Sequence, residues 1–177
     1  MNCAYSLAMS AYADANCSLA RSLEVVGDRW TLLIVRDAFY GVRRFGDFVT
    51  QLQIPRAVLT ARLKLLVEHG VLSRERGPGG TVEYQLTERG VELWPALRAL
   101  MAWGDEHCSP NGVRRVTRHD ADGGTLDADG RCSICHGVVP VTQIRIEPGP
   151  GYDPSRRPRD PVSQLMGGSR RLLEPIR

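Results

Sequence analysis

The sequence has no long apolar run. No stretch approaches the roughly 18 consecutive apolar residues that a helix needs to span a bilayer. The segment Met1–Cys17 also lacks the basic start and the apolar middle of a secretory signal peptide. These absences argue against membrane and exported classes, so we expect a cytoplasmic protein without a membrane partner.

A catalytic constellation is also missing. The four histidines are not accompanied by a glycine-rich nucleophile motif or by a cluster of acids of the kinds linked to hydrolases and transferases. Asp37 and Asp47 lie on predicted helices, where carboxylates commonly have surface or capping roles. We therefore expect that the protein is not an enzyme.

What is present is the composition of an ordinary globular protein with a local excess of positive charge. Apolar residues make up 42% and charged residues 24% of the 177 residues, which suits one sizeable core with an appendage. The net charge is only +3, but residues 43–76 hold seven basic side chains against three acidic ones. Such an excess suits a polyanionic partner.

Hydrophobic periodicity predicts four helices before residue 70. Apolar side chains at helical spacing indicate one helix before and one helix after Gly27–Asp28, which caps the break between them. Residues 44–52 show a short amphipathic pattern. A fourth helix is predicted over residues 55–69, with Pro55 at its first position and Gly70 as its glycine cap.

A hairpin and a last helix follow. Residues 71–76 and 81–86 have the pattern of two short strands, and the glycine-rich turn between them is not expected to be helical. Thr87 caps a long helix that ends near Cys108, with Pro95 as a point where it can bend. This order is the plan of a winged helix-turn-helix, so we predict a mostly α fold with a small β-hairpin and a small C-terminal appendage.

The predicted elements divide the chain into four segments. Residues 1–16 are expected to form a flexible arm, and residues 17–108 a winged helix-turn-helix domain for DNA binding and dimerisation. From residue 109 onward glycine, proline, aspartate and arginine become frequent and large apolar residues become rare. We therefore expect a small C-terminal element over residues 109–148 and a disordered tail over residues 149–177.

The predicted helix over residues 55–69 is suited to reading DNA. A helix in the major groove keeps one face apolar for the core and the opposite face short or hydrogen-bonding. Arg56 is a candidate for a guanine edge, and Thr60 or Ala57 for a thymine methyl. Arginines before this helix and on the hairpin are placed to hold phosphates. The predicted DNA-contacting residues are Arg43, Arg44, Arg56, Ala57, Thr60, Arg62, Lys64, Arg74 and Arg76.

Two other interpretations account for the same basic residues. Isolated basic side chains are usually solvated surface charges. A winged helix can also serve as a protein-contact module, with the C-terminal element as its docking part. The concurrence of element order, hairpin and charge excess favours double-stranded DNA as the partner.

Many spaced residues between positions 17 and 107 carry a family resemblance. They are Cys17, Leu23, Gly27, Trp30, Leu33, Arg36, Arg44, Phe45, Leu59, Arg62, Leu63, Leu66, Gly70, Leu72, Arg74, Tyr84, Gln85, Leu86, Thr87, Gly90 and Trp103. In these positions the chain resembles the HxlR-type regulators of the MarR class. The resemblance implies a homodimeric transcription factor whose first and last helices form the dimer contact and whose two recognition helices meet a near-palindromic operator. The uncharged turn at residues 77–80 departs from the longer, more basic wing often found in the family.

The apolar residues exceed what a four- or five-helix monomer needs, which also indicates a dimer. Obligate dimer interfaces are more apolar than ordinary protein surface. We expect the dimerisation residues to contribute to the core of each subunit as well. They are Leu19, Leu23, Leu97, Leu100 and Trp103.

Cys17 comes just before the first predicted helix. The resemblance implies a role in sensing oxidants or quinones, because several relatives use a cysteine at this position. The positive end of a helix favours the thiolate that such chemistry needs. The alternative is a small buried residue that packs one helix against another.

Cys132 and Cys135 form a C-x-x-C knuckle of the kind that directs two thiolates at one metal ion. With His119 and Asp122 upstream, the segment resembles the H-x-x-C-G plus C-x-x-C module at the end of some regulators of the family, with Asp122 in place of a third thiolate. We predict one zinc ion bound by these four residues. A reversible disulfide between the two cysteines and a relic without metal are the alternatives. A thiol-dependent enzyme would need a scaffold that this segment does not supply.

Overall fold

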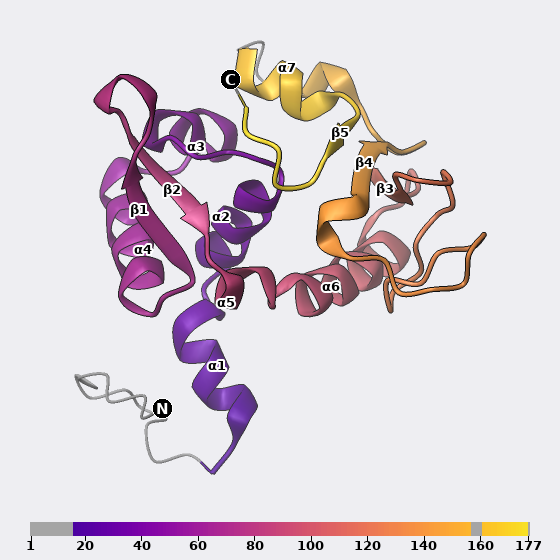
Figure 1. Cartoon of the computed structure of the whole chain (residues 1–177), viewed down its shortest axis with the longest axis horizontal. Helices are drawn as coiled ribbons and strands as arrows, with labels where there is room; N and C mark the ends of the chain where they lie inside the picture. Colours follow the sequence, from indigo (N-terminus) through magenta and orange to yellow (C-terminus); the bar gives the residue numbers. More distant parts are fainter. Residues whose placement is uncertain (1–15, 157–160, 177) are drawn as a thin grey trace.

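A computed structural model describes residues 16–156 and 161–176. Of the predicted arm over residues 1–16, only the last residue lies within the described part. A winged-helix part and a C-terminal part lie side by side and are connected through α6 (Figure 1). The helices are α1 (Ser18–Val26), α2 (Arg29–Phe39), α3 (Phe45–Leu52), α4 (Arg56–Glu68), α5 (Glu88–Val91), α6 (Trp94–Cys108) and α7 (Pro161–Gly167), and the strands are β1 (Leu72–Arg76), β2 (Val82–Leu86), β3 (Arg115–His119), β4 (Ile144–Pro148) and β5 (Arg170–Arg171). Among the described helices, none has the length and apolar character to cross a membrane.

The first four helices follow the sequence pattern. Asp28 precedes α2, and its carboxylate accepts a hydrogen bond of 2.9 Å from the backbone N–H of Trp30. Gln53 adopts a left-handed conformation with φ 50° and ends α3. Pro55 lies one residue before α4 rather than at its first position. The predicted cap between the first two helices is thus confirmed.

β1 and β2 form the predicted hairpin, an antiparallel pair whose register places Leu72 opposite Leu86. The tip contains a short 3-10 turn, η1 (Pro78–Gly80), so the prediction that no helical turn forms there is wrong. Gly79 within this turn has φ 74°, a conformation that glycine adopts without steric cost. Helices α3 and α4 with this hairpin make up the predicted winged helix-turn-helix (Figure 1).

The single long helix predicted after Thr87 is two helices. Thr87 caps α5, accepting a hydrogen bond of 3.1 Å from the N–H of Gly90, and α5 ends at Val91. Pro95 stands four residues later, in the first turn of α6. It has no N–H for the carbonyl of Val91, and its ring would clash with that carbonyl in a continuous helix. The proline therefore breaks the helix rather than bending it.

The core runs through both parts of the molecule. In the winged-helix part it is built on Phe39 and Phe48, and the ring of Phe39 lies 5.0 Å from that of Trp94. In the C-terminal part Ile144 and Ile146 of β4 are completely buried. These residues belong to one continuous apolar cluster, so the C-terminal part packs against the winged helix instead of standing apart.

The C-terminal part is a three-stranded antiparallel sheet of order β3-β4-β5. Arg98 of α6 is buried and donates hydrogen bonds to the carbonyls of Leu126 and Asp127. Arg115 of β3 is also buried and donates to the carbonyls of Met166 and Gly167. Two arginine side chains therefore tie this part together from inside.

The prediction of disorder over residues 149–177 is wrong where the structure describes that segment. It contains α7 and β5, and Met166 and Leu172 are buried. Beyond β5 the chain crosses back over α2 (Figure 1), where Leu173 N–H donates to the Phe39 carbonyl at 2.7 Å. The few apolar residues of this tail suffice because they complete an existing core rather than building their own.

Candidate nucleic-acid interface and metal centre

α4 has two distinct faces. Leu59, Leu63 and Leu66 are buried, while Arg56 and Thr60 are exposed on the other side of the helix. The Thr60 hydroxyl donates to the Arg56 carbonyl at 2.9 Å, and the side chain stays exposed. Ala57 and Lys64 are also exposed. The predicted recognition helix thus presents the short and hydrogen-bonding side chains that the sequence placed on its outer face.

Two of the predicted DNA-contacting arginines are half-buried and donate hydrogen bonds to other segments of the chain. Arg62 donates to the Asp28 carboxylate at 3.2 Å. Arg43 is half-buried and donates to the Leu173 carbonyl at 3.4 Å. Both guanidinium groups therefore contact other segments of the chain, a role that the sequence did not indicate.

The other predicted basic residues lie closer to solvent. Arg44, at the start of α3, has a side chain 46% exposed, with its Nε 3.5 Å from a carboxylate oxygen of Glu83. Arg74 and Arg76 are exposed on β1, in the wing. Lys64 of α4 has Glu68 at 3.6 Å as a surface partner one helical turn away. Of these four side chains, Arg74, Arg76 and Lys64 are exposed, whereas Arg44 is partly engaged by the buried Glu83.

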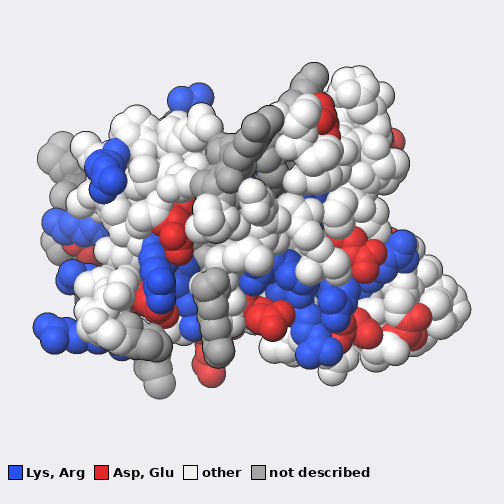
Figure 2. Space-filling view, turned by 90° about the horizontal axis from the view of Figure 1, so that it is seen from above, with Lys and Arg blue, Asp and Glu red and all other residues white. Residues whose placement is uncertain are grey.

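Basic residues of the C-terminal part are arranged differently. On the side of the C-terminal sheet, the face drawn in Figure 2 shows basic and acidic side chains intermingled. Arg145 and Arg171 both contact the Asp120 carboxylate, and Arg118 contacts Glu147 at 2.9 Å. The arginine pair also holds the pKa of Asp120 below its usual value. This region is an ion-pair network rather than a uniformly basic surface.

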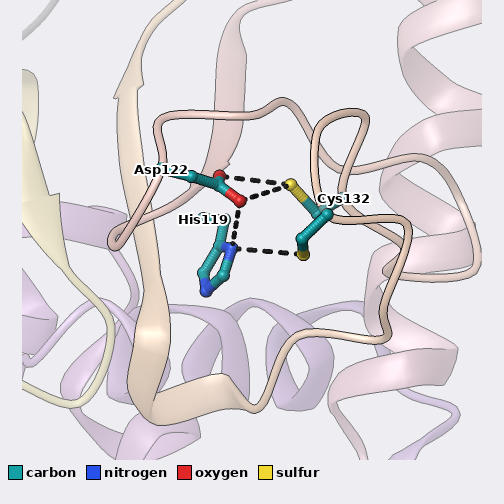
Figure 3. A group of neighbouring side chains, drawn as sticks. His119, Asp122 and Cys132 are labelled. Carbon is teal, nitrogen blue, oxygen red and sulfur yellow. Dashed lines mark hydrogen bonds and ion pairs between the residues drawn. The ribbon is translucent and has the colours of Figure 1, made fainter.

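The four predicted metal ligands come together in the C-terminal part. His119 ends β3, Asp122 lies in the following turn, and Cys132 and Cys135 form the knuckle. One donor atom from each lies within 4.8 Å of the others. Figure 3 shows the side chains of His119, Asp122 and Cys132 pointing toward one another. The structure thus assembles a candidate metal centre from residues that span 17 positions of the sequence, from 119 to 135.

Backbone N–H groups favour the ionised forms of Asp122 and Cys132, whereas the neighbouring Cys132 and Asp122 raise the pKa of Cys135. The N–H of Gly124 donates to Asp122 at 2.9 Å and keeps the pKa of that carboxyl below its usual value. Burial opposes ionisation of the Cys132 thiol, but the N–H groups of Cys135 and Ile134 lower its pKa overall. Carboxylate and thiolate are the forms that bind metal ions.

Comparison with known proteins identifies the family to which this chain belongs. The sequence profile described as HxlR-like helix-turn-helix matches residues 25–112. The HTH-type transcriptional regulator Rv3095 of Mycobacterium tuberculosis, an uncharacterized protein, is 44% identical over 138 residues, which is 76% of this chain and 87% of that relative. The chain belongs to the HxlR-like helix-turn-helix family. It is an HxlR-type transcriptional regulator.

Other relatives agree with this membership of the HxlR-like family. The uncharacterized HTH-type regulator sll1512 of Synechocystis is 33% identical over 93 residues, 51% of this chain and 69% of that relative. The crystal structure of PA1607, a candidate transcription factor, has a TM-score of 0.59 and 38% sequence identity, covering 71% of this chain and 99% of its own. These relatives are thus described as regulators or as a transcription factor.

The residues expected to form the dimer contact of an HxlR-type regulator fall into two groups. Leu19 and Leu23 of α1 are 66% and 52% exposed, and Leu100 and Trp103 of α6 are 52% and 57% exposed. Leu97 is only 6% exposed and belongs to the core. We expected each of these residues to serve both the core and the interface, and this expectation needs correction. Leu97 is a core residue, whereas the other four are surface residues.

Cys17 is exposed at the N-cap position of α1, which is the predicted sensing position in this family. The exposure corrects the alternative in which this cysteine is buried between helices. Cys108, at the end of α6, is also exposed and was not singled out from the sequence.

Sequence reasoning missed one partner of the metal centre. Gln143, in the 3-10 turn η2 (Val141–Gln143) before β4, places its side-chain oxygen 3.3 Å from His119 Nε2. No local motif marks this glutamine. Only the antiparallel pairing of β3 with β4, which sets His119 opposite Ile144, brings it to the histidine.

Proposed function

We propose that this regulator binds duplex DNA as a homodimer, with α4 of each subunit in the major groove of a near-palindromic operator. The division of α4 into two faces carries the proposal. Its inner face is anchored by buried leucines, and its outer face offers Arg56, Ala57 and Thr60. A major groove admits one helix with such an outer face, and these side chains match base edges and thymine methyl groups.

The remaining basic residues have different roles in this proposal. Arg44 and the wing residues Arg74 and Arg76 hold phosphates, which fix orientation without reading sequence. Arg62 and Arg43 act indirectly, because their contacts with Asp28 and Leu173 position α4 and the start of α3. The uncharged wing tip leaves the phosphate contacts to the strand rather than to the turn.

The exposed apolar residues of α1 and α6 support the homodimer. Four large apolar side chains on two helices are more than a monomer surface needs, and burying them would remove apolar area from water in both subunits. A two-fold pairing of these helices also gives two copies of α4, which a near-palindromic operator requires.

The test is equilibrium binding of the full chain to duplex DNA, followed by fluorescence anisotropy. The duplexes are the region upstream of its own gene, a site selected from a randomised pool, and a random sequence. We expect site preference together with an affinity that falls steeply with salt, because each neutralised phosphate lowers log K by about 0.9 per log unit of salt.

Arg131→Ala is a charge-matched control. Arg131 is exposed in the C-terminal element, away from α4 and the wing, so its loss should leave the affinity unchanged. If no duplex is preferred over random DNA at any salt concentration, the protein-contact module becomes the better account of the winged helix.

A further inference from the structure

The cluster of His119, Asp122, Cys132 and Cys135 approaches the dimensions of a zinc site, with one donor atom from each residue within 4.8 Å of the others. His119 Nδ1 lies 3.0 Å from Asp122 Oδ2 and 3.6 Å from Cys135 Sγ. Cys132 Sγ lies 3.2 Å from Asp122 Oδ1. A tetrahedral zinc ion with bonds of about 2.3 Å to sulfur and about 2.0 Å to nitrogen or oxygen separates its ligand atoms by roughly 3.3 to 3.8 Å. The donor atoms therefore already surround one point at nearly the required spacing.

The knuckle has the backbone arrangement that aims both thiols inward. The N–H of Ile134 lies 3.4 Å from Cys132 Sγ, and His136 N–H donates to the Cys132 carbonyl at 2.9 Å. His136 adopts φ 60°, which closes the turn sharply behind Cys135. At Gly124 an added Cβ would collide with Cys132 Sγ, so a glycine is needed for the two loops to approach.

Gln143 offers His119 Nε2 an acceptor that favours a proton on that nitrogen. Its side-chain oxygen accepts a hydrogen bond from Nε2–H of His119 at 3.3 Å. When only Nε2 carries a proton, the lone pair of Nδ1 is available to an ion held by the other three residues, so binding displaces any proton that Nδ1 shares with Asp122. Metal-binding histidines characteristically donate their second ring N–H to such a partner, which fixes the ring and raises its basicity.

The loops around the cluster bury few apolar side chains and are held mainly by hydrogen bonds. Between residues 120 and 138 the buried apolar side chains are Leu126 and Cys132, while Ile134 and Val138 are 58% and 63% exposed. Hydrophobic burial alone therefore contributes little to their order. An ion bound by both loops would supply the missing folding free energy.

We propose that His119, Asp122, Cys132 and Cys135 bind one Zn²⁺ per chain, and that Gln143 positions the histidine for this role. Two thiolates with an imidazole favour zinc over the hard cations Mg²⁺ and Ca²⁺, which take oxygen ligands. Binding displaces the protons of the two thiols. The four protein ligands complete the tetrahedron, so the ion is structural and closes the loops that follow β3.

Metal content of the full chain, purified under reducing conditions without chelator, tests the proposal. We expect about one zinc per chain by mass spectrometry of the elements. Cys132→Ser and Cys135→Ser should remove the metal, whereas Cys108→Ser, at an exposed cysteine outside the cluster, should retain it. Asp122→Ala should weaken binding, and Gln143→Ala should weaken it by about 10- to 100-fold, measured by chelator competition.

A second measurement covers the case in which a cysteine variant fails to fold. Cobalt added to the reduced, metal-free wild type should develop the absorption of a tetrahedral site with thiolate ligands, and zinc should then displace it. A wild type that takes up neither ion would overturn the proposal. Loss of two thiols on mild oxidation of a metal-free chain would instead identify the knuckle as a redox pair and would equally refute the ligand assignment.

Discussion

The guanidinium of Arg62 in α4 donates a hydrogen bond to the carboxylate of Asp28, with 3.2 Å between Nη2 and Oδ2. The other oxygen of the same carboxylate accepts the N–H of Trp30 and caps α2. The Asp28 side chain thus joins α4 to the start of α2. A basic residue of α4 is thus engaged by a carboxylate of its own chain.

The first prediction concerns this cap. Asp28→Ala should lower the free energy of unfolding by about 1 to 2 kcal/mol, since it removes an N-cap and a partly exposed ion pair. Asp28→Asn keeps the capping oxygen and should lose clearly less. Chemical denaturation followed by circular dichroism measures both. Equal losses for the two variants would show that the cap contributes nothing beyond the charge.

The second prediction separates reading of bases from binding of phosphates. Arg56→Ala should relax sequence choice at one base pair, at a cost of about 1 to 3 kcal/mol on the preferred site and little on random DNA. Arg44→Ala should weaken binding to both duplexes alike and reduce the salt slope by about one. Equal losses on specific and random DNA for Arg56→Ala would refute its assignment to a base edge.

The third prediction distinguishes core from interface on α6. Leu97→Ala should destabilise each subunit by about 2 to 5 kcal/mol, because it opens a cavity at a buried position. Trp103→Ala and Leu100→Ala should leave subunit folding intact but raise the dimer Kd by at least about tenfold each. Light scattering coupled to size-exclusion chromatography measures the assembly. A wild type that stays monomeric at micromolar concentration would contradict the dimer.

The fourth prediction concerns Cys17. Because this thiol is exposed at the N-terminus of α1, beside the exposed Leu19, its oxidation should alter the α1 contact and change DNA affinity. Cys17→Ser should bind DNA normally and no longer respond to diamide or peroxide. Cys108→Ser, also at an exposed cysteine, is the matched control and should respond like the wild type. An unchanged response of Cys17→Ser would exclude it as the sensor.

Local patterns account for what could be predicted. The leucines of α4 repeat at helical spacing. The cap at Asp28 and the turn of the hairpin each involve residues only a few positions apart in the sequence. Such signals need no knowledge of distant residues. They were enough to predict the winged helix-turn-helix and the family resemblance, both of which are confirmed.

The break before α6 was partly predictable. Pro95 was recognised as a point of bending, but its effect depends on the carbonyl of Val91, four residues earlier, and on a new start at Trp94. The metal cluster was predicted in full as a set of residues. The four side chains are close in space only because the turn after β3 lies against the knuckle. Their spacing in the sequence does not establish this contact.

By itself the sequence determined the four helices before residue 70, the wing, the family and the four chemically distinctive side chains of the cluster, because periodicity and motif spacing are properties of neighbouring residues. Only the tertiary structure decided which arginines turn inward, that Leu97 is core while Leu100 is surface, that Gln143 meets His119, and that the tail after residue 149 packs on the winged helix. Each of these depends on a partner far away in the chain. The physical reason is that burial and hydrogen bonding depend on which distant residues the fold brings next to a side chain. Local sequence patterns do not identify those distant residues.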